Sequence, residues 1–171
     1  MASHHAGTEP TCPAGKIKYR QTRVPKFWYK SYNHIMPKKI LIIGNILKGN
    51  SVLMRKKFDG SEPYQETWYS FGAEFVTGEE PGETFKKYVK GFAGVDVSPV
   101  RNLLWDTETK KDHDGIEKQF IYLDLECEYV SGEPTIPEGH EKIEWVPIEN
   151  LSTLDVVPPS VIMFKKLGYL K

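Results

Sequence analysis

Apolar positions recur along this chain with the spacing of strands. Residues 40–43 form a continuous apolar run, typical of a strand buried on both faces, and a second strand is expected over residues 52–54. A third strand is expected over residues 68–71. The clearest alternation lies in residues 119–130, where every second side chain is apolar, and it predicts a strand with one polar, half-exposed face.

Helices are predicted after these early strands. A turn built on Gly78 and Pro81 leads into one helix that ends at Gly94. Residues 100–106 then form a predicted strand, followed by a charged loop over residues 107–115. Two helices are expected near the C-terminal end. They begin at Glu149–Leu151 and at Pro158–Ser160.

Charge divides the chain into two parts. The sequence has 171 residues and no formal net charge, yet residues 1–40 hold eight Lys or Arg against the single acid Glu9. The remaining residues hold 15 Lys or Arg against 22 acids. We predict a basic, aromatic N-terminal extension over residues 1–36 and one domain over residues 37–171, a length that allows a substantial core.

Within the predicted extension, residues 16–30 interleave Lys and Arg with the aromatic residues Tyr19, Phe27, Trp28 and Tyr29. Cations that follow phosphates and rings that stack on bases would suit RNA. The same rings would equally serve to pack the extension on the domain or on a protein partner. The sequence leaves these readings open and favours packing.

The chain shows no membrane segment or leader by its sequence. No apolar run approaches the roughly 20 residues that a membrane helix needs, and no basic-then-apolar leader is present. Cys12 and Cys127 lie in different kinds of segment, so a disulfide framework is not expected. We therefore expect an intracellular, cytoplasmic protein without a membrane partner; organelle import through the basic start stays open.

A strand end, a turn and a helix run from Ala73 to Val95. This stretch resembles the signature box of the Nudix family, whose members hydrolyse nucleoside diphosphates linked to another group. The register that keeps the box spacing puts Ala73 at the first glycine, Glu79 at the first glutamate and Lys87 at the arginine. Gly94 and Val95 then end the box, so the frame of the motif is present.

The resemblance fails at the metal ligands. In the family, three glutamates on one helix face bind divalent cations, usually Mg²⁺, which polarise a phosphoryl group and activate a water. Those positions here are Tyr88, Gly91 and Phe92, which carry no carboxylate. A second register, starting at residues 82–84, does not restore the ligands. The resemblance therefore implies a degenerate box without the usual metal site.

Other segments agree with the family. Trp68 stands just ahead of the box, as a tryptophan does in many members, and residues 141–148 resemble the late strand in which a Glu and a Trp precede a short helix. The resemblance covers about residues 38–170. It implies an α/β (α+β) fold, the family's mixed β-sheet sandwiched between helices.

Residues that could still carry catalysis are few. Glu79 and Glu83 lie at the start of the box helix, and Glu141 lies where members sometimes carry a further catalytic Glu. Acids also favour the first turn of a helix for electrostatic reasons, which is the plainer interpretation of Glu79 and Glu83. The Asp112–Glu117 loop has ligand-like chemistry, although a hydrophilic hairpin explains it more simply.

Three functions remain open. We favour a non-catalytic Nudix-fold domain that binds a nucleotide, a nucleoside diphosphate derivative or a partner and requires no cofactor. A divergent hydrolase with relocated ligands, dependent on Mg²⁺ or Mn²⁺, is the first alternative, and an RNA-associated structural subunit is the second. The predicted ligand-binding residues, on the strands that should line the family's cleft, are Trp68, Phe71, Glu74 and Tyr122.

Overall fold

The computed structural model describes residues 36–171, apart from the side chain of Leu104. The described residues form one compact unit, Met36–Lys171, and the domain boundary expected near Met36 stays a prediction. The basic extension, including the aromatic segment 16–30, lies outside the described residues, so its predicted role stays a prediction. No helix in residues 36–171 is long and apolar enough to cross a membrane.

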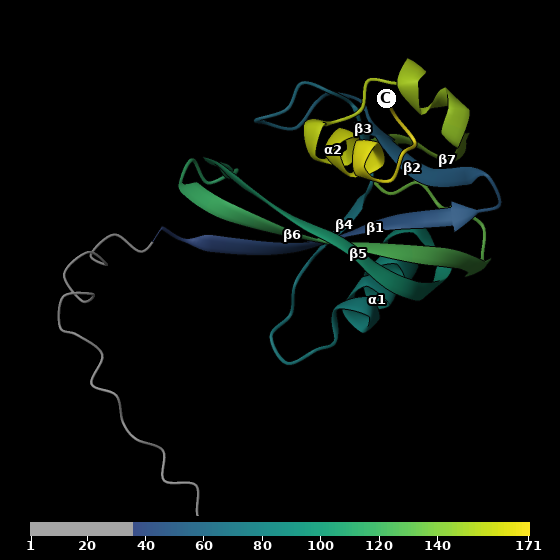
Figure 1. Cartoon of the computed structure of the whole chain (residues 1–171), viewed down its shortest axis with the longest axis horizontal. Helices are drawn as coiled ribbons and strands as arrows, with labels where there is room; N and C mark the ends of the chain where they lie inside the picture. The colour runs from purple at the N-terminus through teal and green to yellow at the C-terminus, as the bar shows by residue number, and fades with distance from the viewer. Residues whose placement is uncertain (1–35) are drawn as a thin grey trace, which may run out of the picture. The chain divides into compact units, whose positions relative to one another are not determined.

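Seven strands form one mixed sheet in this unit (Figure 1). Five of them follow the order β3-β2-β1-β6-β5, while β4 pairs with β1 and β7 pairs with β2. Only β1 and β6 run parallel to each other, with Ile43 opposite Asp124. The strands are β1 (Lys38–Lys48), β2 (Ser51–Lys57), β3 (Trp68–Tyr69), β4 (Phe71–Glu74), β5 (Asp96–Lys111), β6 (Glu117–Ser131) and β7 (His140–Pro147).

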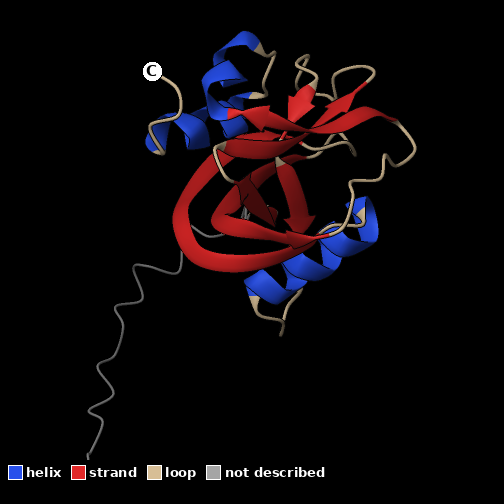
Figure 2. Ribbon diagram, turned by 90° about the vertical axis from the view of Figure 1, so that its right-hand side faces the viewer, coloured by secondary structure: helices blue, strands red, loops and turns tan. Residues whose placement is uncertain are grey.

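Helix α1 (Pro81–Ala93) covers one face of the sheet (Figure 2). Pro81 occupies the first turn, where its missing N–H costs nothing, and the Glu80 side chain caps the helix by accepting from the Glu83 N–H at 3.0 Å. The helix ends at Gly94, whose φ of 73° is a left-handed conformation that suits glycine. The helix predicted between the box turn and Gly94 is therefore present.

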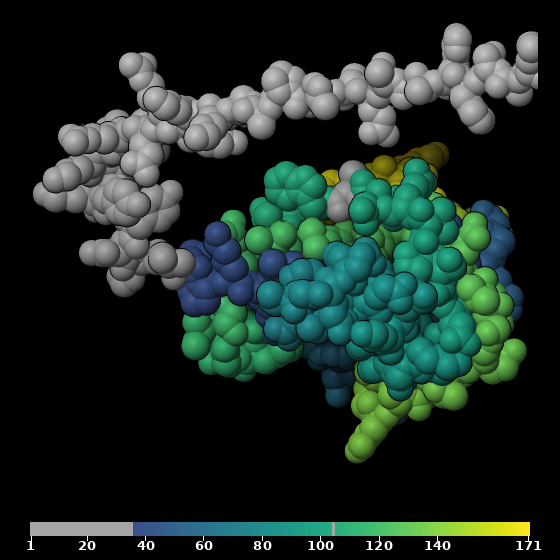
Figure 3. Space-filling view, turned by 90° about the horizontal axis from the view of Figure 1, so that it is seen from below, coloured from purple at the N-terminus to yellow at the C-terminus, as the bar shows by residue number. Residues whose placement is uncertain are grey.

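Phe85 fixes the contact between α1 and the sheet. Its side chain is fully buried, and it lies directly over Gly44 of β1. A Cβ at Gly44 would lie 1.9 Å from Phe85 Cζ, so the strand needs glycine at this point. The core on this side also includes Ile42, Leu53 and Val89. Seen from the α1 side, the box turn and the helix occupy the middle of the surface (Figure 3).

The 3₁₀ helix η2 (Ile148–Thr153) and helix α2 (Pro158–Lys166) lie on the other face of the sheet (Figures 1 and 2). They bury a second core, which includes Trp68, Met163 and Phe164. The predicted mixed sheet between helices is thus confirmed.

Two local predictions were wrong. Strand β5 continues to Lys111, because the charged residues 107–111 pair with β6 as one long hairpin instead of forming a loop. The polar face of β6 is also less exposed than its alternation indicated. Tyr122 and Asp124 are buried, because α2 covers that part of the strand.

Candidate functional site

Two of the three positions that the resemblance aligns with metal ligands, Tyr88 and Phe92, carry aromatic side chains. The rings of Tyr88 and Phe92 stack with centroids 5.2 Å apart. Phe92 also meets His140 edge-on at 5.2 Å and Phe71 at 6.0 Å. Gly91 lies between them in sequence and is exposed. This part of α1 is therefore filled by an aromatic cluster anchored on the sheet.

The guanidinium of Arg55, on β2, lies against this cluster. Its Cζ is 5.3 Å from the centroid of Phe92, and its Nη1 donates to the Tyr88 hydroxyl at 3.4 Å. Its Nε donates to the Ser70 carbonyl at 3.3 Å. Burial lowers the pKa of Arg55, although a guanidinium stays protonated in proteins. A half-buried cation thus contacts Tyr88 and Phe92, two positions that the resemblance aligns with metal ligands.

Arg55 also lines a cavity of about 200 Å³ on the α2 face of the sheet, which we call the cationic pocket. Its walls come from β1 to β4, the loop of residues 61–64, the end of the β5–β6 hairpin and the start of α2. The cations that line it outnumber the two lining acids, Glu62 and Asp112. These cations are Lys39, Arg55, Lys57, Lys110 and Lys111.

Three of these cations have no carboxylate partner among residues 36–171, namely Arg55, Lys57 and Lys111. Lys39 pairs with Asp112 at 3.1 Å, and Lys110 pairs with Glu108 at 3.2 Å. Lys57 instead donates to the Ser61 hydroxyl. Burial, and then repulsion from Arg55, lower the pKa of Lys57. Two adjacent, partly desolvated cations without counter-ions make the pocket a favourable place for an anion.

Neutral hydroxyl groups complete the pocket. The Ser70 hydroxyl is buried and has no hydrogen-bond partner within the described part of the chain. Burial raises the pKa of Tyr122, which keeps its phenol protonated, and the hydroxyl donates to Glu108 at 2.8 Å. The pocket therefore combines charge with neutral hydroxyl groups.

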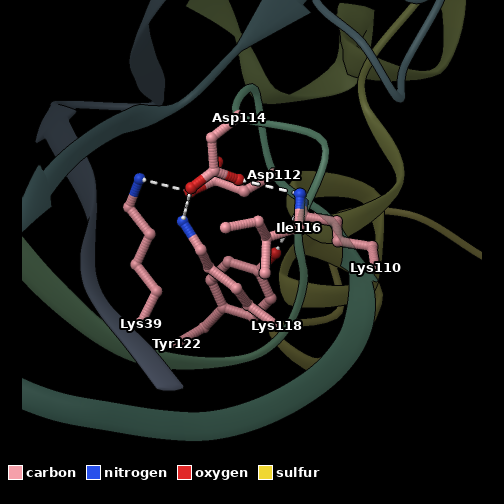
Figure 4. A network of polar contacts seen from close by, with 7 residues as sticks. All are labelled: Lys39, Lys110, Asp112, Asp114, Ile116, Lys118 and Tyr122. Atoms are coloured by element: carbon pink, nitrogen blue, oxygen red, sulfur yellow. Dashed lines mark hydrogen bonds and ion pairs between the residues drawn. The ribbon is translucent and has the colours of Figure 1, made fainter. Parts of the chain in front are cut away.

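The tip of the β5–β6 hairpin holds its own ion pairs (Figure 4). Asp112 accepts from Lys118 at 2.7 Å and from Lys39 at 3.1 Å, and these contacts hold its pKa well below the ordinary range. Asp114 accepts from Lys118 at 2.5 Å. The acids at the start of the Asp112–Glu117 loop are thus engaged by lysines.

The three catalytic candidates lie apart from this pocket. Glu79 accepts from Lys87 at 2.9 Å and from Thr84 at 3.0 Å. Glu83 pairs with Lys86 at 3.0 Å, and Glu141 on β7 pairs with Lys56 at 2.6 Å. Within residues 36–171, no three His, Cys, Asp or Glu side chains gather closely enough to hold a metal ion.

Of the predicted ligand-binding residues, Tyr122 lines the cationic pocket and the other three do not. Trp68 and Phe71 are buried in the two cores, and Glu74 is exposed. The sequence reasoning missed Arg55 and the residues around it, although the run Arg55–Lys57 was visible at the end of a strand. That run alone does not indicate which of its side chains turn inward.

The comparisons with known proteins decide the fold. No protein-family model matches the sequence, and no curated protein matches it. Solved structures do match. A NUDIX hydrolase from Nitrosomonas europaea has a TM-score of 0.61 and 12% identity, covering 77% of this chain and 88% of that one. The chain has the Nudix fold.

Two further solved structures extend this likeness. The MutT protein from Methanosarcina mazei Go1 has a TM-score of 0.60 and 17% identity, covering 80% of this chain and 95% of that one. A UDP-X diphosphatase has a TM-score of 0.55 and 12% identity, covering 84% of this chain and 65% of that one. At these identities the likeness concerns the fold, and function must be argued from the site.

Proposed function

We propose that this Nudix-fold domain binds a nucleotide or nucleoside diphosphate derivative in the cationic pocket and does not hydrolyse it. The observation that carries the proposal is Arg55. It is a half-buried guanidinium without a carboxylate partner in residues 36–171, it lines the pocket, and it contacts the box positions Tyr88 and Phe92.

Arg55 can supply the positive charge that a bound cation supplies in metal-dependent members. A planar guanidinium recognises phosphate through paired N–H donors, and a charge-assisted contact of this kind is about twice as strong as a neutral one. Lys57 and the unpartnered Ser70 hydroxyl add a second charge and a further donor. Together they suit the oxygens of a diphosphate.

Binding without cleavage follows from what an arginine lacks. A catalytic metal both neutralises the phosphate and lowers the pKa of an attacking water. A guanidinium performs the first task only, since it cannot coordinate water or accept a proton. The degenerate box at Tyr88, Gly91 and Phe92 therefore favours a binding domain.

The name of one structural neighbour, UDP-X diphosphatase, indicates the ligand class with which to begin. The experiment measures binding of UDP, a UDP-sugar, ADP-ribose and inorganic pyrophosphate by calorimetry in EDTA. The same compounds are then screened for hydrolysis with Mg²⁺ and with Mn²⁺. We expect saturable, metal-independent binding of at least one diphosphate and no turnover.

Variants make the test specific. Arg55→Met removes the charge but keeps a long side chain, and it should weaken diphosphate binding by about tenfold or more, the loss expected for one charge-assisted contact. Lys57→Met should weaken binding less. Lys165→Met serves as the matched control, because Lys165 is exposed on α2 and lines neither the cationic pocket nor the cavity next to it.

Each alternative function predicts a different result. Metal-dependent turnover that falls by about 10² or more in Glu79→Gln or Glu83→Gln would establish the divergent hydrolase and contradict the proposal. Failure of every diphosphate to bind, combined with RNA retention that requires residues 16–30, would favour the RNA-associated subunit.

A further inference from the structure

A second cavity, of about 130 Å³, lies beside the cationic pocket and beneath the start of α2. We call it the acidic pocket, because the only charged side chains that line it are Asp106, Glu108 and Asp124. The two pockets have walls in common at Ile43, Tyr122 and Pro159.

Asp124 differs from the other two acids because it has no partner. Asp106 pairs with Lys166 at 3.0 Å. Glu108 accepts from Tyr64 at 2.6 Å and from Tyr122 at 2.8 Å. Asp124 is only 5% exposed and has no hydrogen-bond or ion-pair partner among residues 36–171. Its side chain extends from β6 on the side where α2 lies, next to Ile43 on the parallel strand β1.

An unpaired buried carboxylate is costly to a fold. Burial removes the Asp124 carboxylate from water and raises its pKa to about 6. The positive charge of Lys166 lowers this pKa only in part, and the negative charge of Asp106 raises it further. A neutral side chain of the same size would avoid the cost. The carboxylate instead faces a cavity, which is the arrangement of a group that waits for a ligand.

The chemistry of that ligand follows from the groups that Asp124 can bind. A carboxylate accepts hydrogen bonds and attracts cations, so it selects N–H donors such as an ammonium group or the edge of a nucleobase. Divalent cations fit less well, because Asp106 and Glu108 are already engaged and the described residues form no metal-binding group here.

We propose that Asp124 is a specificity-determining residue that binds an N–H donor group on the ligand whose phosphate occupies the cationic pocket. This inference rests on the proposed function, because it assigns the other end of the same ligand. Adjacent pockets of opposite charge, with three wall residues in common, suit one molecule that is anionic at one end and N–H-donating at the other.

Two matched ligand pairs test this inference by calorimetry. GDP presents two adjacent N–H donors on its base, and IDP lacks the exocyclic amine. Phosphoethanolamine carries N–H donors on its ammonium, whereas phosphocholine carries methyl groups. We expect the richer donor of at least one pair to bind about tenfold or more tightly, and the pair that shows the preference identifies the source of the N–H group.

Asp124→Asn should abolish that preference while leaving the weaker ligand of the pair nearly unchanged. Glu126→Gln is the control, since Glu126 is the next residue on the same face of β6 but pairs with Arg101 and lines neither pocket. It should keep the preference.

The outcomes separate this inference from the proposed function. If diphosphates bind but neither pair shows a preference, or if Asp124→Asn retains it, the role of Asp124 is wrong and the cationic pocket stands. If no phosphate compound binds the wild type, the proposed function fails and the inference fails with it.

Discussion

The two faces of the sheet carry different side chains beside their helices. On the α1 face, Tyr88 and Phe92 stack on each other, and the helix is held by a tight apolar core. On the α2 face, two cavities of opposite charge remain open. Arg55 connects them, since it contacts Tyr88 and lines the cationic pocket. The difference teaches that aromatic packing can anchor a helix on one face of a sheet while charged groups line open space on the other.

The largest expected effect tests the structural role of α1. Phe85→Ala removes a fully buried ring that packs on Gly44 and should lower the free energy of unfolding by about 4 kcal/mol. Urea unfolding followed by tryptophan fluorescence measures this change.

Lys86→Ala is the neighbouring control, and it should change the free energy of unfolding by no more than about 0.5 kcal/mol because its ion pair with Glu83 is exposed. A loss below about 1 kcal/mol for Phe85→Ala would mean that the helix is not anchored as described.

The next prediction tests the α2 face, where a substitution should raise the free energy of unfolding instead of lowering it. Asp124 has a pKa of about 6 in the folded chain, above the roughly 3.9 of an unfolded one. Its contribution to stability is therefore full below about pH 4 and is lost as the pH rises through about 6. Asp124→Asn does not titrate, so it should be more stable than the wild type by about 2 kcal/mol near pH 7.

The difference between the two proteins should shrink toward zero near pH 4, where Asp124 is protonated. Unfolding of both proteins in urea across this range provides the measurement, and titrations of the other groups cancel in the comparison. A variant that is destabilised near pH 7 would show that Asp124 has a partner that stabilises its charge.

The sequence predicted the fold better than the site, and particular residues show why. Local patterns define α1, because a turn with proline, an apolar stripe and a closing glycine all lie within one short segment. The site depends instead on which strand residues α2 covers. The polar face of β6 predicted exposure, yet Asp124 is buried by residues far along the chain, such as Met163.

The position of Arg55 shows that the environment of a charged residue is equally hard to predict from the local sequence. A basic run at the end of a strand is usually solvated, and its neighbour Lys56 does pair with the exposed Glu141. Arg55 points the other way because successive strand residues face opposite sides, and it meets Phe92 from α1. Tertiary packing of that kind has no signature in the local sequence.

The smallest predicted effect concerns Gly91 and tests whether this position on α1 takes part in ligand binding. Gly91 lies inside α1, is exposed, and has no atom within 4 Å of the position that a Cβ would take. Gly91→Ala should therefore raise the free energy of unfolding by about 0.5–1 kcal/mol, because alanine loses less conformational entropy in a helix. Pyrophosphate binding should not change, because the proposed ligand site lies on the other face. Gly94→Ala is the matched control with the opposite sign, since its φ of 73° penalises any side chain. If Gly91→Ala weakened pyrophosphate binding, this box position would belong to the ligand site, and the division between a structural α1 face and a binding α2 face would have to be redrawn.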